Sequence, residues 1–133
     1  MRYLILILAV AFIGCGTTSW VSNPSDENNT KIEKAIRETI NKPTGELTKA
    51  DLDKVTKLYL HNYKLTSLKG VGKLNQLTWL TLNNNKLTDV KRLEKLTQLK
   101  DLDLRINPDL TKAQIAELKK ALPKCKISSN PTK

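Results

Sequence analysis

The stretch Leu77-Thr-Trp-Leu-Thr-Leu-Asn-Asn-Asn-Lys-Leu87 decides the fold of this chain, because its pattern recurs along the sequence. The central pair of leucines is found in three copies, spaced 22 residues apart, at Leu58-x-Leu60, Leu80-x-Leu82 and Leu102-x-Leu104. A regular period in this range is the signature of a solenoid, in which each repeat buries its apolar face against its neighbours. The sequence therefore predicts a short α/β solenoid.

The copies also agree outside the central pair. One has its matching residues at Leu77, Leu80, Leu82, Asn85, Leu87 and Val90, and the next at Leu99, Leu102, Leu104, Asn107 and Leu110. This pattern resembles the 22-residue leucine-rich repeat of bacterial internalin-like proteins. The resemblance implies parallel β-strands on a concave face, a helical N-terminal cap, a helical C-terminal cap and a binding function without catalysis.

Alternation along each predicted strand sends the leucines inward and the intervening residues outward. Stacking the repeats then gives three outward columns: Lys57, Trp79 and Asp101; Tyr59, Thr81 and Asp103; and His61, Asn83 and Arg105. An exposed Trp with Tyr and Arg nearby has the composition of an interaction hot spot. We predict that a protein or peptide partner binds at Tyr59, His61, Trp79, Thr81, Asn83, Asp101, Asp103 and Arg105. The alternative is a short sheet that simply tolerates an exposed aromatic residue.

Asn85 and Asn107 stand where each repeat leaves its strand, so their amides are predicted to satisfy buried backbone groups of the turn. The first repeat has Tyr63 at this place, which departs from the pattern. The opposite, convex side of the core is predicted to be lined by Val71, Leu74, Leu93 and Leu96.

Amphipathic helices are predicted at both ends of the repeats. Before them, the spacing of Ile32, Ala35, Ile36 and Ile40 places one apolar stripe on a helix. A capping box at Thr48 and Asp51 begins a second, short helix, and another at Thr111 and Gln114 begins the last helix, which Pro123 stops. A final strand is expected at residues 124–127. The first of these segments resembles the N-terminal cap of internalin-like proteins.

The N-terminus has the parts of a secretory signal peptide: one basic residue, ten apolar residues from Leu4 to Ile13, and Gly14 before Cys15. Phe12-Ile13-Gly14-Cys15 resembles the lipobox of bacterial lipoproteins, which implies lipidation at Cys15. The alternative is a cleaved, non-lipidated signal. We expect an exported chain anchored by lipid to the bacterial cell envelope. In Gram-negative lipoproteins an Asp directly after the cysteine acts as a signal for retention at the inner membrane. Gly16 stands at that position here, so we expect the outer membrane if the source is Gram-negative.

These features predict six segments. They are a signal peptide at 1–14, a flexible tether at 15–29, a helical N-terminal cap at 30–54, leucine-rich repeats at 55–109, a C-terminal capping repeat at 110–128 and a tail at 129–133. The tether has little apolar content, so we predict that Trp20 is a disordered aromatic residue, with contact to the membrane interface as the alternative.

The chain is strongly basic, with 23 Lys and Arg against 13 Asp and Glu. Loss of Arg2 with the signal would leave 22 against 13, a net charge of +9. Such a surface either keeps the protein in solution or contacts anionic envelope polymers. Nucleic acid is not an expected partner, because an exported chain would rarely meet it.

No pattern indicates an enzyme or a cofactor. His61 is the one histidine, and no Ser or Cys nucleophile lies at a recognisable distance from it. Arg105 beside Asp101 and Asp103 opposes a hard metal ion, so no metal site is predicted. Gly70-Val-Gly-Lys73 lacks parts of a phosphate-binding loop and is better explained as a turn between repeats. Cys125 is expected to fill a small buried slot rather than to react.

Overall fold

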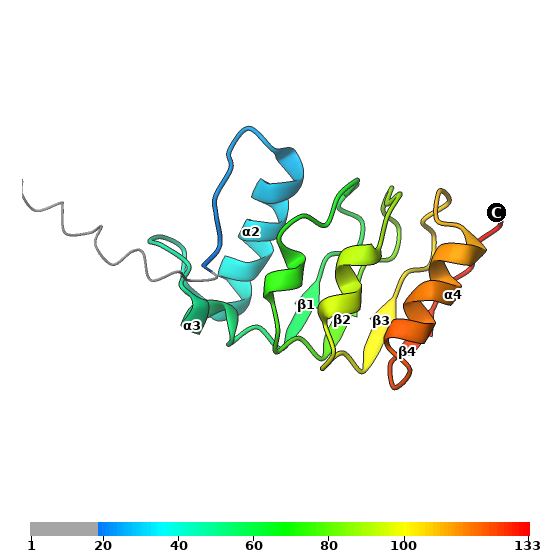
Figure 1. Ribbon diagram of the computed structural model, residues 1–133. Coiled ribbons are helices and arrows are strands. Elements are labelled where there is room, and N and C mark those ends of the chain that lie inside the picture. The colour runs from blue at the N-terminus through cyan, green and yellow to red at the C-terminus, as the bar shows by residue number, and fades with distance from the viewer. Residues whose placement is uncertain (1–18) are drawn as a thin grey trace, which may run out of the picture.

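A computed structural model describes residues 19–133 of the protein. Its elements follow the order α2 (Glu27–Ile40), α3 (Lys49–Leu52), β1 (Lys57–Tyr59), 3-10 helix η1 (Val71–Lys73), β2 (Trp79–Thr81), 3-10 helix η2 (Lys91–Lys95), β3 (Asp101–Asp103), α4 (Lys112–Ala121) and β4 (Lys126–Ser128). The four strands form one parallel sheet in the order β1-β2-β3-β4, with the 3-10 helices and α4 on its other side (Figure 1). The predicted α/β solenoid architecture is therefore present.

The strands are aligned residue for residue. Leu58 pairs with Leu80, Leu80 with Leu102, and Leu102 with Ile127. The strand leucines are buried, as the alternation predicts, and so is the lining of the convex side at Val71, Leu74, Leu93 and Leu96. One continuous core runs from Trp20 to Leu122. Each short strand thus depends on its neighbours in the stack to bury its apolar face.

Asn85 and Asn107 form a buried amide ladder between repeats, which confirms their predicted structural role. The Asn85 side chain accepts from the backbone N–H of Tyr63 at 3.1 Å and of Leu65 at 2.9 Å. Its amide donates to the carbonyls of Leu60 at 2.8 Å and Leu82 at 2.9 Å. Asn107 donates in the same way to the carbonyls of Leu82 and Leu104, both at 3.0 Å.

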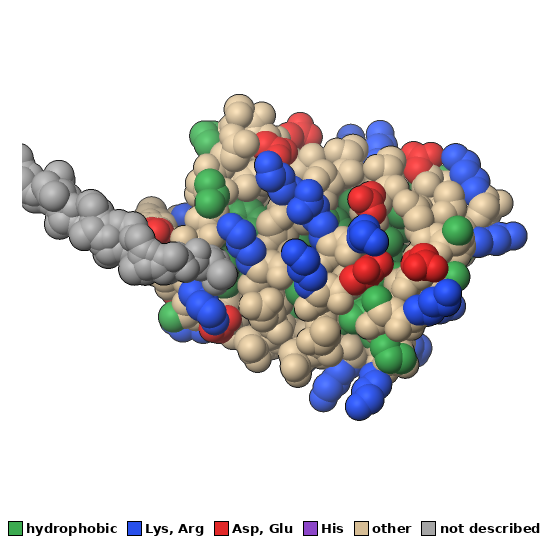
Figure 2. All heavy atoms as spheres, in the orientation of Figure 1, with side chains coloured by type: hydrophobic (Ala, Val, Ile, Leu, Met, Phe, Trp, Pro, Cys, Tyr) green, Lys and Arg blue, Asp and Glu red, His purple; other side chains and the backbone are tan. Residues whose placement is uncertain are grey.

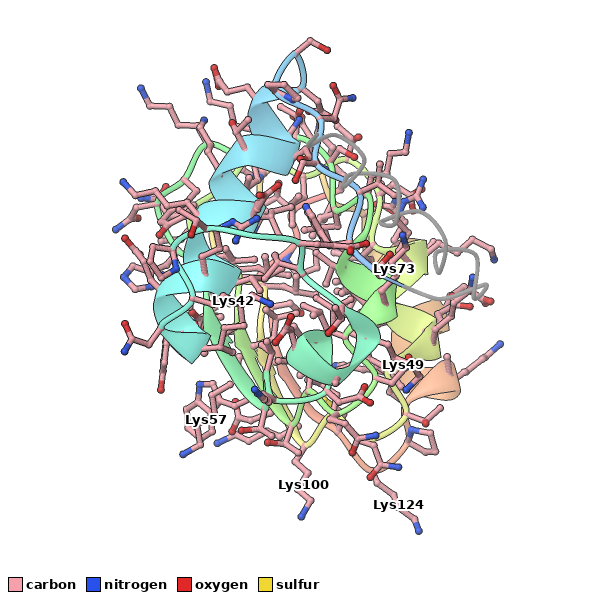
Figure 3. All side chains as sticks on the ribbon, turned by 90° about the vertical axis from the view of Figure 1, so that its left-hand side faces the viewer. Lys42, Lys49, Lys57, Lys73, Lys100 and Lys124 are labelled. Carbon is pink, nitrogen blue, oxygen red and sulfur yellow. The ribbon has the colours of Figure 1, made fainter. Side chains whose placement is uncertain are left out.

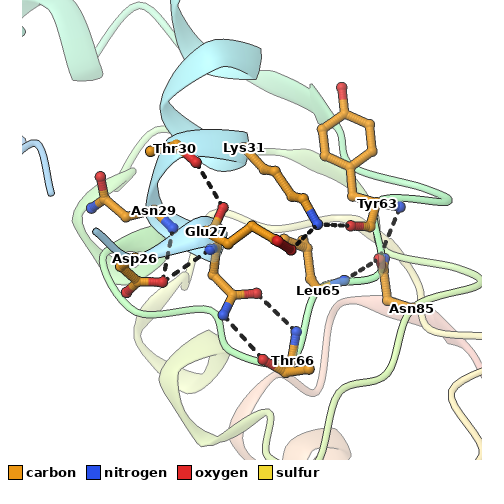
Figure 4. Close-up of polar contacts among 10 residues, drawn as sticks. Asp26, Glu27, Asn29, Thr30, Lys31, Tyr63, Leu65, Thr66 and Asn85 are labelled. Carbon is orange, nitrogen blue, oxygen red and sulfur yellow. Dashed lines mark hydrogen bonds and ion pairs between the residues drawn. The ribbon is translucent and has the colours of Figure 1, made fainter. Parts of the chain in front are cut away.

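Helix α2 packs beside β1 and binds the turn of the first repeat. Lys31 of α2 donates from Nζ to the carbonyl of Tyr63 at 2.8 Å and pairs with Glu27, also at 2.8 Å (Figure 4). The amide side chain of Asn28 both accepts from the backbone of Thr66 and donates to its hydroxyl. The turn in which Tyr63 departs from the repeat pattern is therefore held by α2 as well as by Asn85.

Both predicted capping boxes are confirmed. The hydroxyl of Thr48 accepts from the backbone of Asp51, and that of Thr111 accepts from the backbone of Gln114. The first helix, however, starts at Glu27 and not near Thr30, because the carboxylate of Asp26 accepts from the backbone amides of Asn28 and Asn29. Helix α2 buries Ile32 and Ile36 completely beside β1, and α4 buries Ile115 and Leu118.

The prediction that Trp20 belongs to a disordered tether was wrong, as was a flexible tether for the described part of 15–29. Trp20 is only 5% exposed, its indole donates to Glu33 at 3.0 Å, and its backbone N–H donates to the carbonyl of Leu47 at 3.1 Å. Its ring lies on Gly70, where an added Cβ would stand 2.8 Å from the ring. One large aromatic side chain in a matching slot thus orders a segment whose composition is otherwise polar.

The Asp51 carboxylate in α3 gives the fold a pH dependence. Its hydrogen bond from Lys42 at 2.7 Å, followed by that from the Thr48 backbone at 2.9 Å, lowers the pKa of Asp51 to about 2. Because the folded-state pKa lies below the unfolded value, this stabilisation is fully present above the unfolded pKa near 4 and is lost as the pH falls toward 2.

Asp51→Asn is therefore expected to lower the free energy of unfolding by about 2 kcal/mol at neutral pH and to have little effect at pH 2. Urea unfolding of both proteins at the two pH values measures this. An equal difference at both values would show that the charge of Asp51 is not what stabilises α3.

Among residues 19–133, no helix has the length and apolar character needed to cross a membrane. The predicted signal peptide and the lipidation residue Cys15 lie outside the described residues.

Candidate functional site

The concave face of the sheet carries the predicted outward columns. Strand register aligns Lys57 with Trp79 and Asp101, and Tyr59 with Thr81 and Asp103. Strand β4 extends these columns by Lys126 and Ser128, a contribution that the prediction did not include. Past the strands, the backbone N–H of Asn62 donates to Asn83 at 3.1 Å and that of Asn84 to Arg105 at 2.9 Å. The same alignment therefore continues through His61, Asn83 and Arg105.

Two aromatic side chains dominate the exposed part of this face. Tyr59 is 51% exposed and Trp79 is 40% exposed, although both belong to strands whose leucines are fully buried. The Lys57 ammonium lies 6.0 Å from the centre of the Trp79 ring, at the limit of a cation–π contact. Apolar area, an indole donor and a cation are thus presented side by side, which is the chemistry of a protein-binding hot spot.

A groove beside β1 adds a concave element to the face. Its volume is about 480 Å³, and its walls are Lys57, Tyr59, His61 and Tyr63 from the first repeat and Ala35, Glu38 and Thr39 from α2. The sequence-based prediction missed Tyr63 and the three helix residues. The repeat period carries no information about α2, and the resemblance to an N-terminal cap places a helix on the first repeat without showing which helix residues line the first column.

Arg105 is held by its own strand. Its guanidinium makes two hydrogen bonds to Asp103, from Nε at 2.9 Å and from an Nη at 2.7 Å. The hydrogen bond from Arg105 lowers the pKa of Asp103. The two charges therefore largely neutralise each other, and this end of the face is less cationic than the presence of Arg105 predicts. Across 19–133, His, Cys, Asp and Glu nowhere form a group of three that could hold a metal ion.

The remaining predicted residues differ in the exposure of their side chains. His61 is exposed, whereas Thr81, Asn83, Asp101 and Asp103 are half-buried. The Thr81 hydroxyl is buried without a hydrogen-bond partner among the described residues. The exposed side chains are thus Tyr59, His61 and Trp79, and the half-buried residues form the floor between them.

Cys125 packs against the core, but it is only half-buried and not enclosed in the buried slot that was predicted. Burial, and then the nearby charge of Asp101, raises the pKa of its thiol to about 11. The thiol is therefore protonated at neutral pH, and the nucleophilic thiolate is scarce.

No protein-family model matches the sequence, and the curated proteins contain no match. Solved structures do match. An internalin of Listeria monocytogenes superposes on 77% of this chain with a TM-score of 0.59 and 22% identity. Internalin C2 of the same organism also covers 77%, with a TM-score of 0.56 and 21% identity. A leucine-rich repeat protein of Leptospira interrogans covers 62%, with a TM-score of 0.52 and 36% identity. The chain has a leucine-rich repeat fold.

These proteins are longer than this chain, which spans 31% of the first internalin, 56% of internalin C2 and 22% of the Leptospira protein. The similarity therefore concerns the fold. Leucine-rich repeat solenoids present an extended concave surface, and partners commonly bind there. In this chain that surface is the sheet face around Tyr59 and Trp79.

Proposed function

We propose that this chain is a non-enzymatic leucine-rich repeat module that binds a protein or peptide through its concave face. The observation that carries the proposal is the exposure of Trp79 and Tyr59 in adjacent columns of a sheet whose strand leucines are fully buried. The groove between β1 and α2 supplies a concave site for an anchoring side chain. Only a few strands form the face, so a single contact is expected to be of modest affinity.

We further propose that a lipid on Cys15 holds the module at a bacterial membrane. The support is the lipobox-like sequence from Phe12 to Cys15 after ten apolar residues. Display of many copies on one membrane would raise the avidity for a multivalent partner. Growth with a radiolabelled fatty acid tests this step, because label should enter the wild-type protein and not Cys15→Ser.

In this proposal α2 with α3 and the segment 110–128 cap the two ends of the solenoid. The support is the burial of Ile32, Ile36 and Leu118 against the terminal repeats. Truncation after Asn107 should expose the core beneath α4 and abolish cooperative unfolding. Retention of a cooperative transition would show that the last helix is not a cap.

The second candidate function is a structural lipoprotein held to anionic envelope polymers by charge, which the net charge of +10 favours. Ionic strength separates the two candidates. We expect the immobilised chain to capture a discrete protein from envelope extracts and to retain it at high ionic strength, because an aromatic contact is poorly screened by salt.

Trp79→Ala should lose this capture, and Val21→Ala is the matched control because Val21 is 67% exposed but lies beside Trp20 and Gly70 and not on the sheet face. Binding that vanishes with salt and survives Trp79→Ala would instead support the charge-held protein.

A further inference from the structure

The first described residues, Ser19 and Trp20, lie on the convex side of the fold, opposite the strands. The carbonyl of Ser19 accepts from Nζ of Lys73, in η1, at 2.9 Å. The next residue, Trp20, packs on Gly70 at the start of the same 3-10 helix. Figure 3 shows Lys73 on the side of the 3-10 helices, whereas Lys57 lies at the start of the sheet. The fixed end of the N-terminal segment is thus on the side away from the candidate binding face.

Cations gather around this point. Lys69, Lys73 and Arg92 line a shallow hollow of about 360 Å³ next to Trp20 and Gly70. Lys95 adjoins it, with its aliphatic stem 3.8 Å from where a Cβ on Gly72 would stand. We call these four residues the basic face, and Figure 2 shows Lys and Arg side chains gathered over the 3-10 helices.

Acidic groups near the basic face offset only part of this charge. Asp26 also lines the hollow, but its carboxylate is used by the amides at the start of α2. Glu94 lies 4.0 Å from Lys91, a further lysine of η2. Lys69, Arg92 and Lys95 are exposed and form no ion pair with another described residue at 4.0 Å or less. The basic face therefore keeps a surplus of positive charge toward solvent.

The sequence limits the distance between the basic face and the proposed lipid on Cys15. Three residues separate Cys15 from Ser19, so their Cα atoms are at most about 14 Å apart even in a fully extended chain. Of the fifteen residues of the predicted tether, only 15–18 therefore precede the fixed Ser19. Basic side chains this close to a membrane lie within reach of its surface potential.

We propose that the basic face rests on an anionic phospholipid bilayer and holds the concave face toward the opposite side, where a partner can reach it. This inference rests on the proposed lipid anchor at Cys15. A single lipid signal is commonly reinforced by a basic patch, and here the fold itself places that patch beside the anchor. The bilayer is favoured over a soluble polymer because Ser19, four positions after the proposed anchor, is held by Lys73 of the basic face.

Lysine acetylation in vesicles tests the inference. The intact protein, made with its own leader, is reconstituted into vesicles of phosphatidylcholine alone or of equal parts phosphatidylcholine and phosphatidylglycerol. Acetylation of each lysine by an activated acetate ester is then followed by mass spectrometry. We expect Lys69 and Lys95 to react about fivefold more slowly in the anionic vesicles, and high salt to remove the difference.

Three lysines elsewhere provide the internal reference. Lys57, Lys100 and Lys124 lie together at the edge where the strands begin, away from Lys73 (Figure 3), and their rates should not change. Arg92→Gln should weaken the protection of Lys69 and Lys95, whereas Lys124→Gln, which removes the same charge from the reference edge, should leave it intact.

Each other outcome overturns the inference in a recognisable way. Equal protection of the reference lysines would mean that the domain lies on the membrane in another orientation. If the protein floats with the vesicles but no lysine is protected, the folded domain does not contact the bilayer surface. That result would reject the orientation and still support the lipid anchor at Cys15. Protection by soluble heparin on neutral vesicles, but not by phosphatidylglycerol, would assign the face to anionic polymers. Failure to float, with no diacylglyceryl mass on Cys15, would reject both the anchor and the orientation.

Discussion

Asn85→Ala is expected to lower the free energy of unfolding by about 3–5 kcal/mol, since it leaves several buried backbone groups without partners. The Asn85 amide is 3% exposed and makes four hydrogen bonds, two accepted from the turn of the first repeat and two donated to strand-end carbonyls. The Ala side chain has neither a donor nor an acceptor to replace these contacts. Urea unfolding followed by far-UV circular dichroism gives the difference.

Asn75→Ala is the matched control, because Asn75 is an exposed turn residue, and its effect should be within about 0.5 kcal/mol of zero. Asn85→Asp should be as damaging as Asn85→Ala, since a carboxylate cannot donate to the carbonyls of Leu60 and Leu82. A loss below about 1 kcal/mol for both Asn85 variants would show that the amide ladder does not hold the repeats together.

Trp20→Ala is expected to destabilise the fold by about 3–5 kcal/mol, although Trp20 precedes every helix and strand of the described fold. Its ring fills a slot over Gly70, and its indole and backbone N–H bind Glu33 and Leu47. Removal of the ring would leave a cavity between the N-terminal segment and the first repeat. Thermal and urea unfolding measure the loss.

Two pairs of substitutions make this prediction specific. Trp79→Ala should cost much less stability than Trp20→Ala, because Trp79 is 40% exposed and Trp20 is 5% exposed. Gly70→Ala should be destabilising, since Gly70 has φ +95° and its Cβ would collide with the Trp20 ring, whereas Gly72→Ala would meet atoms no closer than 3.5 Å. Equal stability of the Gly70 and Gly72 variants would contradict the docking of Trp20.

Local repetition explains which features were predictable. The spacing of Leu58, Leu80 and Leu102 fixes which side chains point inward, so the core, the aligned columns and the amide ladder all follow from it. The capping boxes at Thr48 and Thr111 are equally local, since each joins residues three positions apart. Because these features depend on the repeat period or on residues close in sequence, the sequence was sufficient to predict the architecture and the outward residues of the sheet.

The features that the sequence did not predict depend on contacts between distant segments. Trp20 meets Gly70, Lys31 meets Tyr63, and α2 forms one wall of the groove beside Tyr59. No period relates these residues. The ion pair of Arg105 with Asp103 was missed for another reason: both were correctly placed outward, but composition does not show that a charge is already paired.

The measurement that tests the central claim most directly is photo-crosslinking in intact cells from the concave face. A benzophenone amino acid in place of Tyr59 preserves an aromatic ring at a position that is 51% exposed, and the same residue at Lys119 in α4 is the control. A binding module predicts a discrete protein adduct from position 59 that disappears with Trp79→Ala and is absent from position 119. No protein adduct from position 59, or an identical adduct with Trp79→Ala, would contradict binding through this face.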